Sequence, residues 1–371
     1  GLLVLWLGWL GWLGQCALLV RAGEGGVEVL HPQPPDAVRG EPHRSPPLRY
    51  NVSGATVSWL RVGGEIAIVA RPRTASEWRG AAMLARDNGM EFLVLGEGSN
   101  TLVAPGRVDA VVAVSGMRSI TAIGDTVIRA QGGARMDDVV RFAVGRGLGG
   151  LEEFSGIPGT VGGAVAMNIH YRTRLLADVV CGAHVMDLAR SGVVIAVPPA
   201  WFRFEYDYSL LLERRFVLID VDLCLRALSR ESLRTARRER STILLRRATR
   251  YPPFGTTGCV FQNLPGCPQP SANCSAAYYL DQAGAKELAT ANMQVHSTHA
   301  NMLLTTGDAA TAEEAVWLVR RMHELVYAKF GIALQPEVRW LGTTPSMLET
   351  SGLHQATERF WGGDMVPGTP R

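Results

Sequence analysis

The residues best suited to chemistry lie in a glycine-rich segment at positions 147–168. Seven of its residues are glycine, and Ser155, Pro158 and Thr160 stand between them instead of long charged side chains. Glycine allows positive φ and removes the side-chain wall, so successive N–H groups can approach a ligand closely. The composition therefore favours a loop that cradles an anionic group such as a pyrophosphate. A pair of tight turns between packed elements is the alternative interpretation.

A second loop of the same character, the upstream loop, occupies residues 96–100 and reads Gly-Glu-Gly-Ser-Asn. Apolar runs precede and follow it, and Ser99 and Asn100 add side-chain donors. Thr101 stands where a Gly-x-Gly-x-x-Gly motif needs its last glycine, and no helical pattern follows. The sequence therefore disfavours the Rossmann dinucleotide fold.

Together, the two loops resemble those of the UDP-N-acetylenolpyruvoylglucosamine reductase family, FAD enzymes that complete UDP-N-acetylmuramate in peptidoglycan (cell wall) synthesis. The resemblance rests on residues 96–103 and on residues 155–164, Ser-Gly-Ile-Pro-Gly-Thr-Val-Gly-Gly-Ala, and it extends from about residue 61 to residue 339. It implies an α+β chain with a two-subdomain FAD-binding fold of the vanillyl-alcohol-oxidase/PCMH type, followed by a C-terminal α+β substrate domain. The compact C-terminal region is similar to the shorter of the family's two architectures.

The resemblance also implies FAD as the cofactor and NADPH as the hydride donor. The pyrophosphate of FAD is expected between the two subdomains, against both loops. The predicted cofactor-binding residues are Gly63, Gly96, Gly98, Ser99, Asn100, Ser155, Gly156, Ile157, Pro158, Gly159, Thr160, Gly162, Gly163 and Ala164.

Two residues match the family's catalytic positions. Cys259, in Gly-Cys-Val-Phe-Gln-Asn at 258–263, stands where the family has a serine proton donor, and Glu337 matches its catalytic glutamate. A thiol has a pKa of about 8.5 in model peptides, so it is protonated at neutral pH and gives up its proton more readily than an alcohol. The alternative for Cys259 is a small buried cysteine.

The chain departs from the family pattern in two places. Small residues normally follow the asparagine that ends the glycine-rich segment, whereas residues 169–175 are bulky or charged. The family's Phe-x-Tyr-Arg-x-Ser has an arginine thought to steady the substrate's enolate, and Asp207 occupies that position here. A carboxylate would repel a negatively charged intermediate. Either Arg203, which we assign to the catalytic set, or Arg172 supplies the charge, or Asp207 faces solvent and the activity is impaired.

The resemblance implies UDP-N-acetylglucosamine enolpyruvate as the substrate. Lys286 stands in a stretch similar to the family's Ala-Gly-Leu-Lys-Gly and is expected to act as a point charge on the diphosphate. Asn263 is expected to donate to the substrate, whereas His299 is either a substrate contact or a turn histidine. The predicted substrate-binding residues are Tyr206, Ser209, Gln262, Asn263, Lys286, His299 and Asn301.

Local patterns indicate the elements that position these residues. A strand at 66–69, a helix from the Thr74 N-cap to residue 86 and a strand at 93–95 form a small β-α-β unit that presents the upstream loop. Further strands within 109–131 and a helix at 136–145 lead into the glycine-rich segment. The later predictions are a strand at 217–223, a solvated arginine-rich helix within 229–250, and helices at 275–284 and 309–330.

These elements give predicted domain limits. The first FAD-binding subdomain is residues 49–114, the second is 115–228, the substrate domain is 229–342, and 343–371 is a tail. Residues 1–48 are expected to lie outside the fold, as an apolar stretch followed by a linker. A translated upstream region or a truncated reading frame explains the apolar stretch about as well as a membrane anchor, because no basic region precedes it and no clean cleavage site follows.

The composition limits the partners. A formal net charge of +3 on 371 residues, with no basic run interleaved with aromatic residues, argues against nucleic acid as a ligand. The six cysteines form no Cys-x-x-Cys pair and have no histidine at ligand spacing, so no metal site is predicted. We expect reduced thiols in a cytoplasmic, monomeric protein.

The implied chemistry is ping-pong. NADPH reduces the flavin and leaves, and the enolpyruvyl ether then receives a hydride at its methylene carbon and a proton from Cys259, with Glu337 assisting at the carboxylate. Two alternatives stay open. One is a flavin-binding paralogue that does not turn over because of Asp207, and the other is an FAD oxidase or dehydrogenase of the same wider fold that acts on another substrate.

Overall fold

The computed structural model of the chain describes residues 19–23, 26–30, 44–171, 174–252, 255–264 and 274–342. The chain divides into two units, Gly1–Glu41 and Pro42–Arg371. In the first unit, β1 (Leu19–Gly23) and β2 (Gly26–Leu30) pair as an antiparallel hairpin. The interpretation of residues 1–48 as an apolar stretch and a linker outside the fold stays a prediction. Among the described helices, none combines the length and apolar character that a membrane crossing requires.

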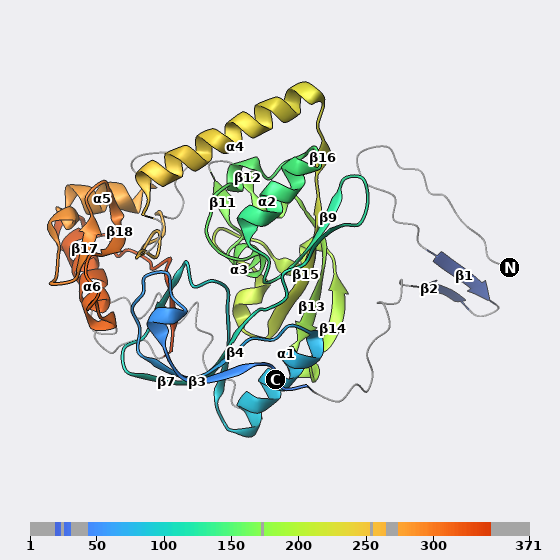
Figure 1. Cartoon of the computed structure of the whole chain (residues 1–371), viewed down its shortest axis with the longest axis horizontal. Coiled ribbons are helices and arrows are strands. Elements are labelled where there is room, and N and C mark those ends of the chain that lie inside the picture. Colours follow the sequence, from blue (N-terminus) through green and yellow to red (C-terminus); the bar gives the residue numbers. More distant parts are fainter. Residues whose placement is uncertain are drawn as a thin grey trace. The chain divides into compact units, whose positions relative to one another are not determined.

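The second unit starts with a four-stranded sheet in the order β3-β4-β7-β5 (Figure 1). Its strands are β3 (Leu48–Ser53), β4 (Glu65–Ala70), β5 (Glu91–Leu95) and β7 (Arg107–Val114). β4 and β5 both run parallel to β7, and α1 (Ala75–Asp87) connects β4 to β5. Thr74 Oγ1 accepts a hydrogen bond from the N–H of Glu77 at 3.1 Å, and Asn88 ends the helix. The predicted β-α-β unit is therefore confirmed.

A second, five-stranded antiparallel sheet follows in the order β14-β13-β15-β9-β8. Val139 of α2, Val165 of α3 and Val221 of β15 share one hydrophobic core, so these helices cover one face of the sheet. The helix predicted at 136–145 is α2, and the strand predicted at 217–223 lies within β15. The bounds are β8 (Ile120–Ala122), β9 (Val127–Gln131), α2 (Met136–Gly145), α3 (Val161–Ala166), β13 (Val180–Asp187), β14 (Val193–Val197) and β15 (Phe216–Cys224), with the short pairs β10 (Leu148–Gly149) and β16 (Arg226–Ala227), and β11 (His170–Tyr171) and β12 (Arg174–Leu175).

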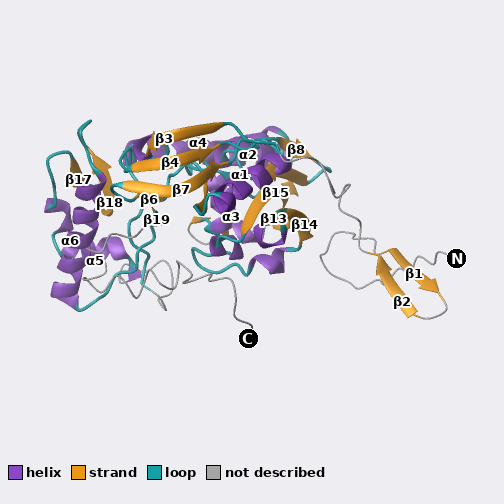
Figure 2. Ribbon diagram, turned by 90° about the horizontal axis from the view of Figure 1, so that it is seen from below, coloured by secondary structure: helices purple, strands orange, loops and turns teal. Residues whose placement is uncertain are grey.

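The C-terminal part packs α5 and α6 against the β17–β18 hairpin (Figure 2). Its last strand, β19, pairs in parallel with β6 (Thr101–Val103), the strand that follows the upstream loop. Leu60 and Leu102 join the same hydrophobic core as α6, so this part is packed on the first sheet region. The domain limits given above stay a prediction. The bounds are α5 (Ala276–Gln282), β17 (Met293–His296), β18 (His299–Thr305), α6 (Ala312–Phe330) and β19 (Arg339–Leu341).

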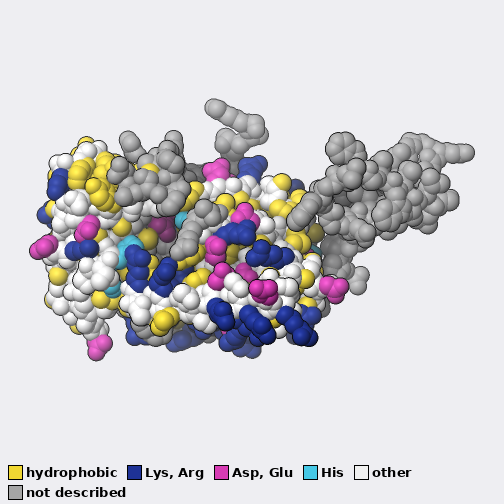
Figure 3. Space-filling view, turned by 90° about the horizontal axis from the view of Figure 1, so that it is seen from above, with side chains coloured by type: hydrophobic (Ala, Val, Ile, Leu, Met, Phe, Trp, Pro, Cys, Tyr) yellow, Lys and Arg dark blue, Asp and Glu magenta, His cyan; other side chains and the backbone are white. Residues whose placement is uncertain are grey.

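Helix α4 (Arg230–Arg250) extends from the α5–α6 part to α2 (Figure 1). Ala236 is its one fully buried residue, which confirms the predicted solvated helix. Lys and Arg side chains gather on the face of the molecule that carries α4 (Figure 3). Arg240 anchors the helix by donating two hydrogen bonds to the Asp137 carboxylate, at 2.7 and 2.8 Å.

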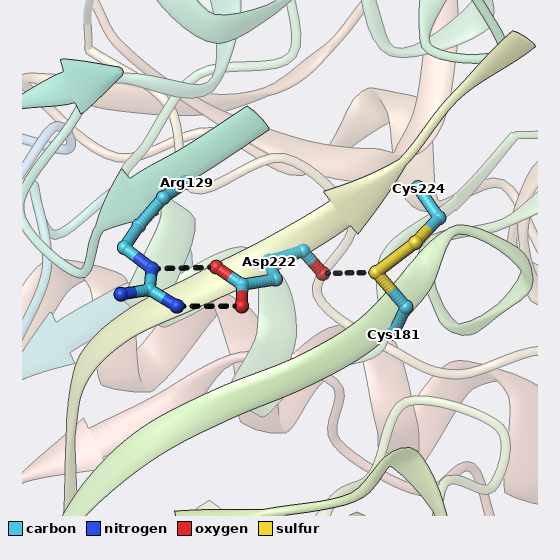
Figure 4. Close-up of a disulfide and its surroundings, with 4 residues drawn as sticks. All are labelled: Arg129, Cys181, Asp222 and Cys224. Carbon is cyan, nitrogen blue, oxygen red and sulfur yellow. Dashed lines mark hydrogen bonds and ion pairs between the residues drawn. A yellow bond between two sulfur atoms is a disulfide. The ribbon is translucent and has the colours of Figure 1, made fainter. Parts of the chain in front are cut away.

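The expectation of reduced cysteines is wrong for the second sheet. Cys181 on β13 and Cys224 on β15 form a disulfide (Figure 4). A register shift beside Cys181 in this antiparallel pair brings the two Cα atoms to 5.8 Å, close enough for a disulfide. The bond lies next to the Arg129–Asp222 ion pair, whose two hydrogen bonds are each 2.7 Å. Cys274 is also disulfide-bonded, and Cys259 is the free thiol within the described ranges.

Candidate active site

The upstream loop and the glycine-rich segment contact each other directly. Ser99 Oγ donates to the main-chain oxygen of Pro158 at 3.2 Å. A Cβ on Gly96 would lie 2.7 Å from Thr160 Oγ1, and a Cβ on Gly159 would lie 2.9 Å from Ser99 Oγ. Real Cβ atoms do not approach other atoms so closely, so glycine at both positions lets the loops meet.

The upstream loop keeps unused polar groups for a ligand. Gly98 adopts a φ of +70°, and a Cβ there would lie 2.1 Å from the main-chain oxygen of Val57. Over the ranges that the structure describes, the backbone N–H groups of Gly98, Ser99 and Asn100 donate to no acceptor, and Asn100 Oδ1 is buried without a partner. A buried polar group without a partner is costly. The loop therefore fits a bound polar ligand, and its N–H groups fit the oxygen atoms of a pyrophosphate.

The glycine-rich segment uses several of its own polar groups to hold its shape. The N–H of Gly156 donates to Asp137 Oδ1 at 2.8 Å. Thr160 is the N-cap of α3, and its Oγ1 accepts from the N–H of Gly163 at 3.3 Å. The N–H of Gly162 donates to a main-chain oxygen at 2.8 Å. Ser155 is fully buried, and its Oγ donates to a main-chain oxygen at 2.5 Å. These groups shape the loop and leave most of the unused donors to residues 98–100.

Three further predicted cofactor residues lie around the loops. Gly63 has a φ of +148°, and a Cβ there would lie 2.6 Å from Val103 Cβ, so it allows close packing behind the upstream loop. The N–H of Ile157 donates to the main-chain oxygen of Phe154. Ala164 is buried in the hydrophobic core that α2, α3 and β15 share. Their contacts with a cofactor stay predictions.

The structure brings Cys259 and Glu337 together from different elements. The main-chain oxygen of Val260 accepts hydrogen bonds from the N–H groups of Glu337 at 2.8 Å and Val338 at 3.2 Å. Asn100 Nδ2 donates to the main-chain oxygen of Glu337 at 3.2 Å, and Asn100 accepts at its own main-chain oxygen from the N–H of Arg339 at 3.0 Å. The thiol and the acid are therefore held beside the upstream loop.

Burial favours the protonated form of both groups. Burial raises the pKa of the Cys259 thiol well above its ordinary value, and the nearby Glu337 and Asp207 carboxylates raise it further. Burial and Asp207 likewise raise the pKa of Glu337, which Arg339 opposes. Each side chain still keeps some surface accessible to solvent. The pair can therefore offer protons to a ligand at this point.

Asp207 does not face solvent, which corrects that alternative. Its residue is 3% exposed, and Oδ1 lies 3.4 Å from His170 Nδ1. The charge associated with it comes from Arg339, whose pKa burial lowers to about 10 while Asp207 and Glu337 oppose that shift. Arg203 is exposed, and its described electrostatic contact is with Tyr208 rather than with Cys259 or Glu337. Arg172 lies outside the described residues.

Arg339 was missed as a site residue, although it stands two positions after Glu337. Side chains two apart in an extended chain point to the same side, so this spacing was the available signal.

The predicted substrate residues divide into groups. Asn263 Nδ2 donates to Tyr206 Oη at 3.5 Å, and Tyr206 interacts electrostatically with Asp207, Glu337 and Cys259, so these two residues border the cluster. Ser209 is fully buried, with an Oγ that has no partner.

The side chain of Asn301 has a structural role. Its side-chain amide bonds both the N–H and the main-chain oxygen of Phe261, at 2.9 and 2.7 Å, which aligns the segment that carries Cys259. Gln262 bonds through its main-chain N–H to Gln335 at 2.8 Å on the neighbouring segment.

Lys286 and His299 interact electrostatically. Lys286 Nζ pairs with Asp281 at 2.7 Å. Burial lowers the pKa of His299 to about 4, and the positive charges of Arg250 and Lys286 add to that effect. Among the described residues, His299 Nδ1 is buried without a hydrogen-bond partner, so this nitrogen is available to a ligand.

Two layers of sheet and helix, with glycine loops that meet beside a thiol and an acid, are the arrangement expected of a flavin-dependent oxidoreductase. Residues 66–196 match the family pattern described as the FAD binding domain, and residues 250–341 match the C-terminal domain of UDP-N-acetylenolpyruvoylglucosamine reductase. The predicted α+β, two-subdomain FAD-binding fold is confirmed, and the unused groups of the upstream loop fit FAD.

Known relatives identify the family. The chain is 32% identical over 300 residues to the UDP-N-acetylenolpyruvoylglucosamine reductase of Heliobacterium modesticaldum, covering 81% of this chain and 92% of that protein. It is 33% identical over 289 residues to that of Pelobacter propionicus, with 76% and 92% coverage. The crystal structure of the enzyme from Thermus caldophilus superposes with a TM-score of 0.65 at 27% identity, covering 79% of this chain and 99% of that one. The chain belongs to the UDP-N-acetylenolpyruvoylglucosamine reductase family and is an FAD-dependent oxidoreductase.

Proposed function

We propose that the protein reduces UDP-N-acetylglucosamine enolpyruvate to UDP-N-acetylmuramate with NADPH, in the cytoplasmic stage of peptidoglycan synthesis. The observation that carries this proposal is the hydrogen bond from Asn100 to Glu337, because it fixes the acid against the loop that fits the FAD pyrophosphate. Family membership supports the same substrate class.

Bound FAD would supply hydride transfer between NADPH and the substrate. The chain's own residues supply position and protons. The upstream loop, held open by Gly98, would bind the pyrophosphate, while Cys259 holds the proton that the substrate must gain at the carbon next to the methylene group. Glu337, whose pKa burial raises, lies on the neighbouring segment and would contact the substrate carboxylate.

Lys286 and His299 would serve the diphosphate of the substrate. The lysine supplies a point charge, and the unpartnered nitrogen of His299 supplies a donor or acceptor, depending on its tautomer. The ion pair between Lys286 and Asp281 would have to exchange for a phosphate contact.

The buried Asp207 favours one alternative, a family member that binds FAD without turning over. Stopped-flow absorbance separates the two possibilities. The proposed reductase binds FAD, is bleached by NADPH and is reoxidised by UDP-N-acetylglucosamine enolpyruvate. A protein that NADPH bleaches but the enolpyruvyl substrate does not reoxidise would contradict the proposal and support the alternative.

A further inference from the structure

His170 and Asp207 form a pair at the edge of the Cys259–Glu337 cluster. His170 Nδ1 lies 3.4 Å from Asp207 Oδ1, and the two side chains are 29% and 4% exposed. The Tyr206 ring packs against the imidazole, with centroids 4.8 Å apart. The pair therefore combines a buried carboxylate with an imidazole that a ligand can still reach.

The surroundings of Asp207 require positive charge. Electrostatic interactions join it to the thiol of Cys259, to Glu337 and to Arg339, and its Oδ2 is buried without a hydrogen-bond partner. A carboxylate buried beside another acid is stable only with a cation in contact. Arg339 is shared with Glu337, and His170 is a further residue whose side chain contacts Asp207.

The orientation of His170 follows from this contact. A carboxylate at Nδ1 favours the tautomer that carries a proton on that nitrogen. Nε2 is then the nitrogen left to contact a ligand. Asp207 acts through His170 and is a positioning residue.

We propose that His170, oriented by Asp207, binds the carboxylate of the enolpyruvyl substrate and stabilises the negative charge that develops there. The inference rests on the proposed reductase function. The hydride forms a C–H bond at the methylene carbon, and the π electrons of the C=C bond move toward the carboxylate. The proton from Cys259 then forms the second C–H bond, so the substrate gains two electrons and two hydrogen atoms.

The test compares half-reactions in the FAD-loaded, full-length protein. The rate of flavin reduction by NADPH and the rate of reoxidation by UDP-N-acetylglucosamine enolpyruvate are measured by stopped flow in the wild type, His170→Gln, His170→Lys, Asp207→Asn and the His170→Gln/Asp207→Asn double variant. His184→Gln is the matched control, because His184 Nδ1 also faces a carboxylate, Asp220 Oδ1 at 2.7 Å, on strands β13 and β15. FAD content and thermal unfolding report on folding.

We expect His170→Gln to slow reoxidation by roughly 100-fold and to leave reduction by NADPH unchanged. His170→Lys supplies a positively charged donor and should recover part of the rate. Asp207→Asn should slow reoxidation less, and the double variant should be no slower than His170→Gln, since Asp207 acts through the imidazole. His184→Gln should behave as the wild type.

Wild-type reoxidation in His170→Gln would overturn the inference, and so would equal losses in the glutamine and lysine variants or fully additive losses in the double variant. If His170→Gln does not retain FAD, the reoxidation rates of His170→Lys and Asp207→Asn test the inference. Wild-type reoxidation in both would overturn it. A wild type that the substrate does not reoxidise contradicts the proposed function itself, and the inference falls with it.

Discussion

Asn100 donates from Nδ2 to the main-chain oxygen of Glu337 at 3.2 Å, across 237 residues of sequence. The N–H of Arg339 returns a hydrogen bond to the main-chain oxygen of Asn100 at 3.0 Å. This reciprocal contact continues into the parallel pairing of β6 with β19. The loop that fits the cofactor and the segment that carries Glu337 are therefore fixed to each other by hydrogen bonds.

Gly98→Ala should abolish or severely weaken FAD binding. The new Cβ would lie 2.1 Å from the main-chain oxygen of Val57, so the upstream loop must move. Gly106→Ala is the matched control, because its φ of +77° is similar and nothing lies within 4 Å of its Cβ position. In both variants alanine must adopt a positive φ, which costs about 1–3 kcal/mol. Only Gly98→Ala should lose the quenching of flavin fluorescence when FAD is titrated. Equal FAD affinity in the two variants would contradict the role of close packing.

Cys259→Ala should slow reoxidation of the reduced flavin by the enolpyruvyl substrate by roughly 10²- to 10⁴-fold, because the proton donor is removed. Cys259→Ser keeps a donor and should retain much more of that rate. Reduction by NADPH serves as the internal control in the same stopped-flow record and should not change. Reoxidation of Cys259→Ala at the rate of Cys259→Ser would leave the thiol without a catalytic role.

Glu337 should make stability depend on pH. Its pKa in the folded chain is raised well above the ordinary 4.5, mainly by burial. Its contribution to the free energy of unfolding is therefore fully present below pH 4.5 and is lost as pH rises through the folded pKa. Glu337→Gln has no such loss, so the wild type should become less stable relative to this variant as pH rises above 4.5. Urea unfolding across this range checks it, and parallel curves would refute it.

Arg240→Ala should weaken the glycine-rich segment. Arg240 holds Asp137, which also accepts from the N–H of Gly156, so the substitution loosens the link between α4 and the loop. Loss of this partly buried pair should cost about 1–3 kcal/mol of stability and lower FAD affinity. Arg238→Ala, an exposed position on the same helix, is the control and should change neither. Chemical denaturation and flavin titration measure both effects, and indistinguishable variants would exclude the anchoring role.

Replacing Cys181 and Cys224 with serine should lower the free energy of unfolding by about 2–4 kcal/mol, since the disulfide closes a loop across 43 positions and restricts the unfolded chain. Urea unfolding without reductant compares the variant with the wild type. Equal midpoints would show that the bond is absent in solution.

Local sequence determined the parts whose signals are local. Thr74 with Glu77 predicted the start of α1, and the 136–145 pattern predicted α2, because caps and apolar periodicity act within a few residues. The two glycine loops could be predicted for the same reason, because a high density of glycine is visible in the sequence without knowledge of the packing. Cys259 and Glu337 were assigned through their motifs.

Tertiary structure decided which distant residues meet. Three findings depend on how separate elements pack: the contact of the buried Asp207 with His170, the electrostatic interaction of Arg339 with Asp207, and the Cys181–Cys224 disulfide. The sequence around a charged residue or a cysteine does not show which distant residues it will contact. Asn301 illustrates the same limit, because its amide could serve a ligand or a strand, and only the position of Phe261 directs it to the strand. The sequence thus determined the loops and the reactive groups, whereas packing determined their partners and their charges.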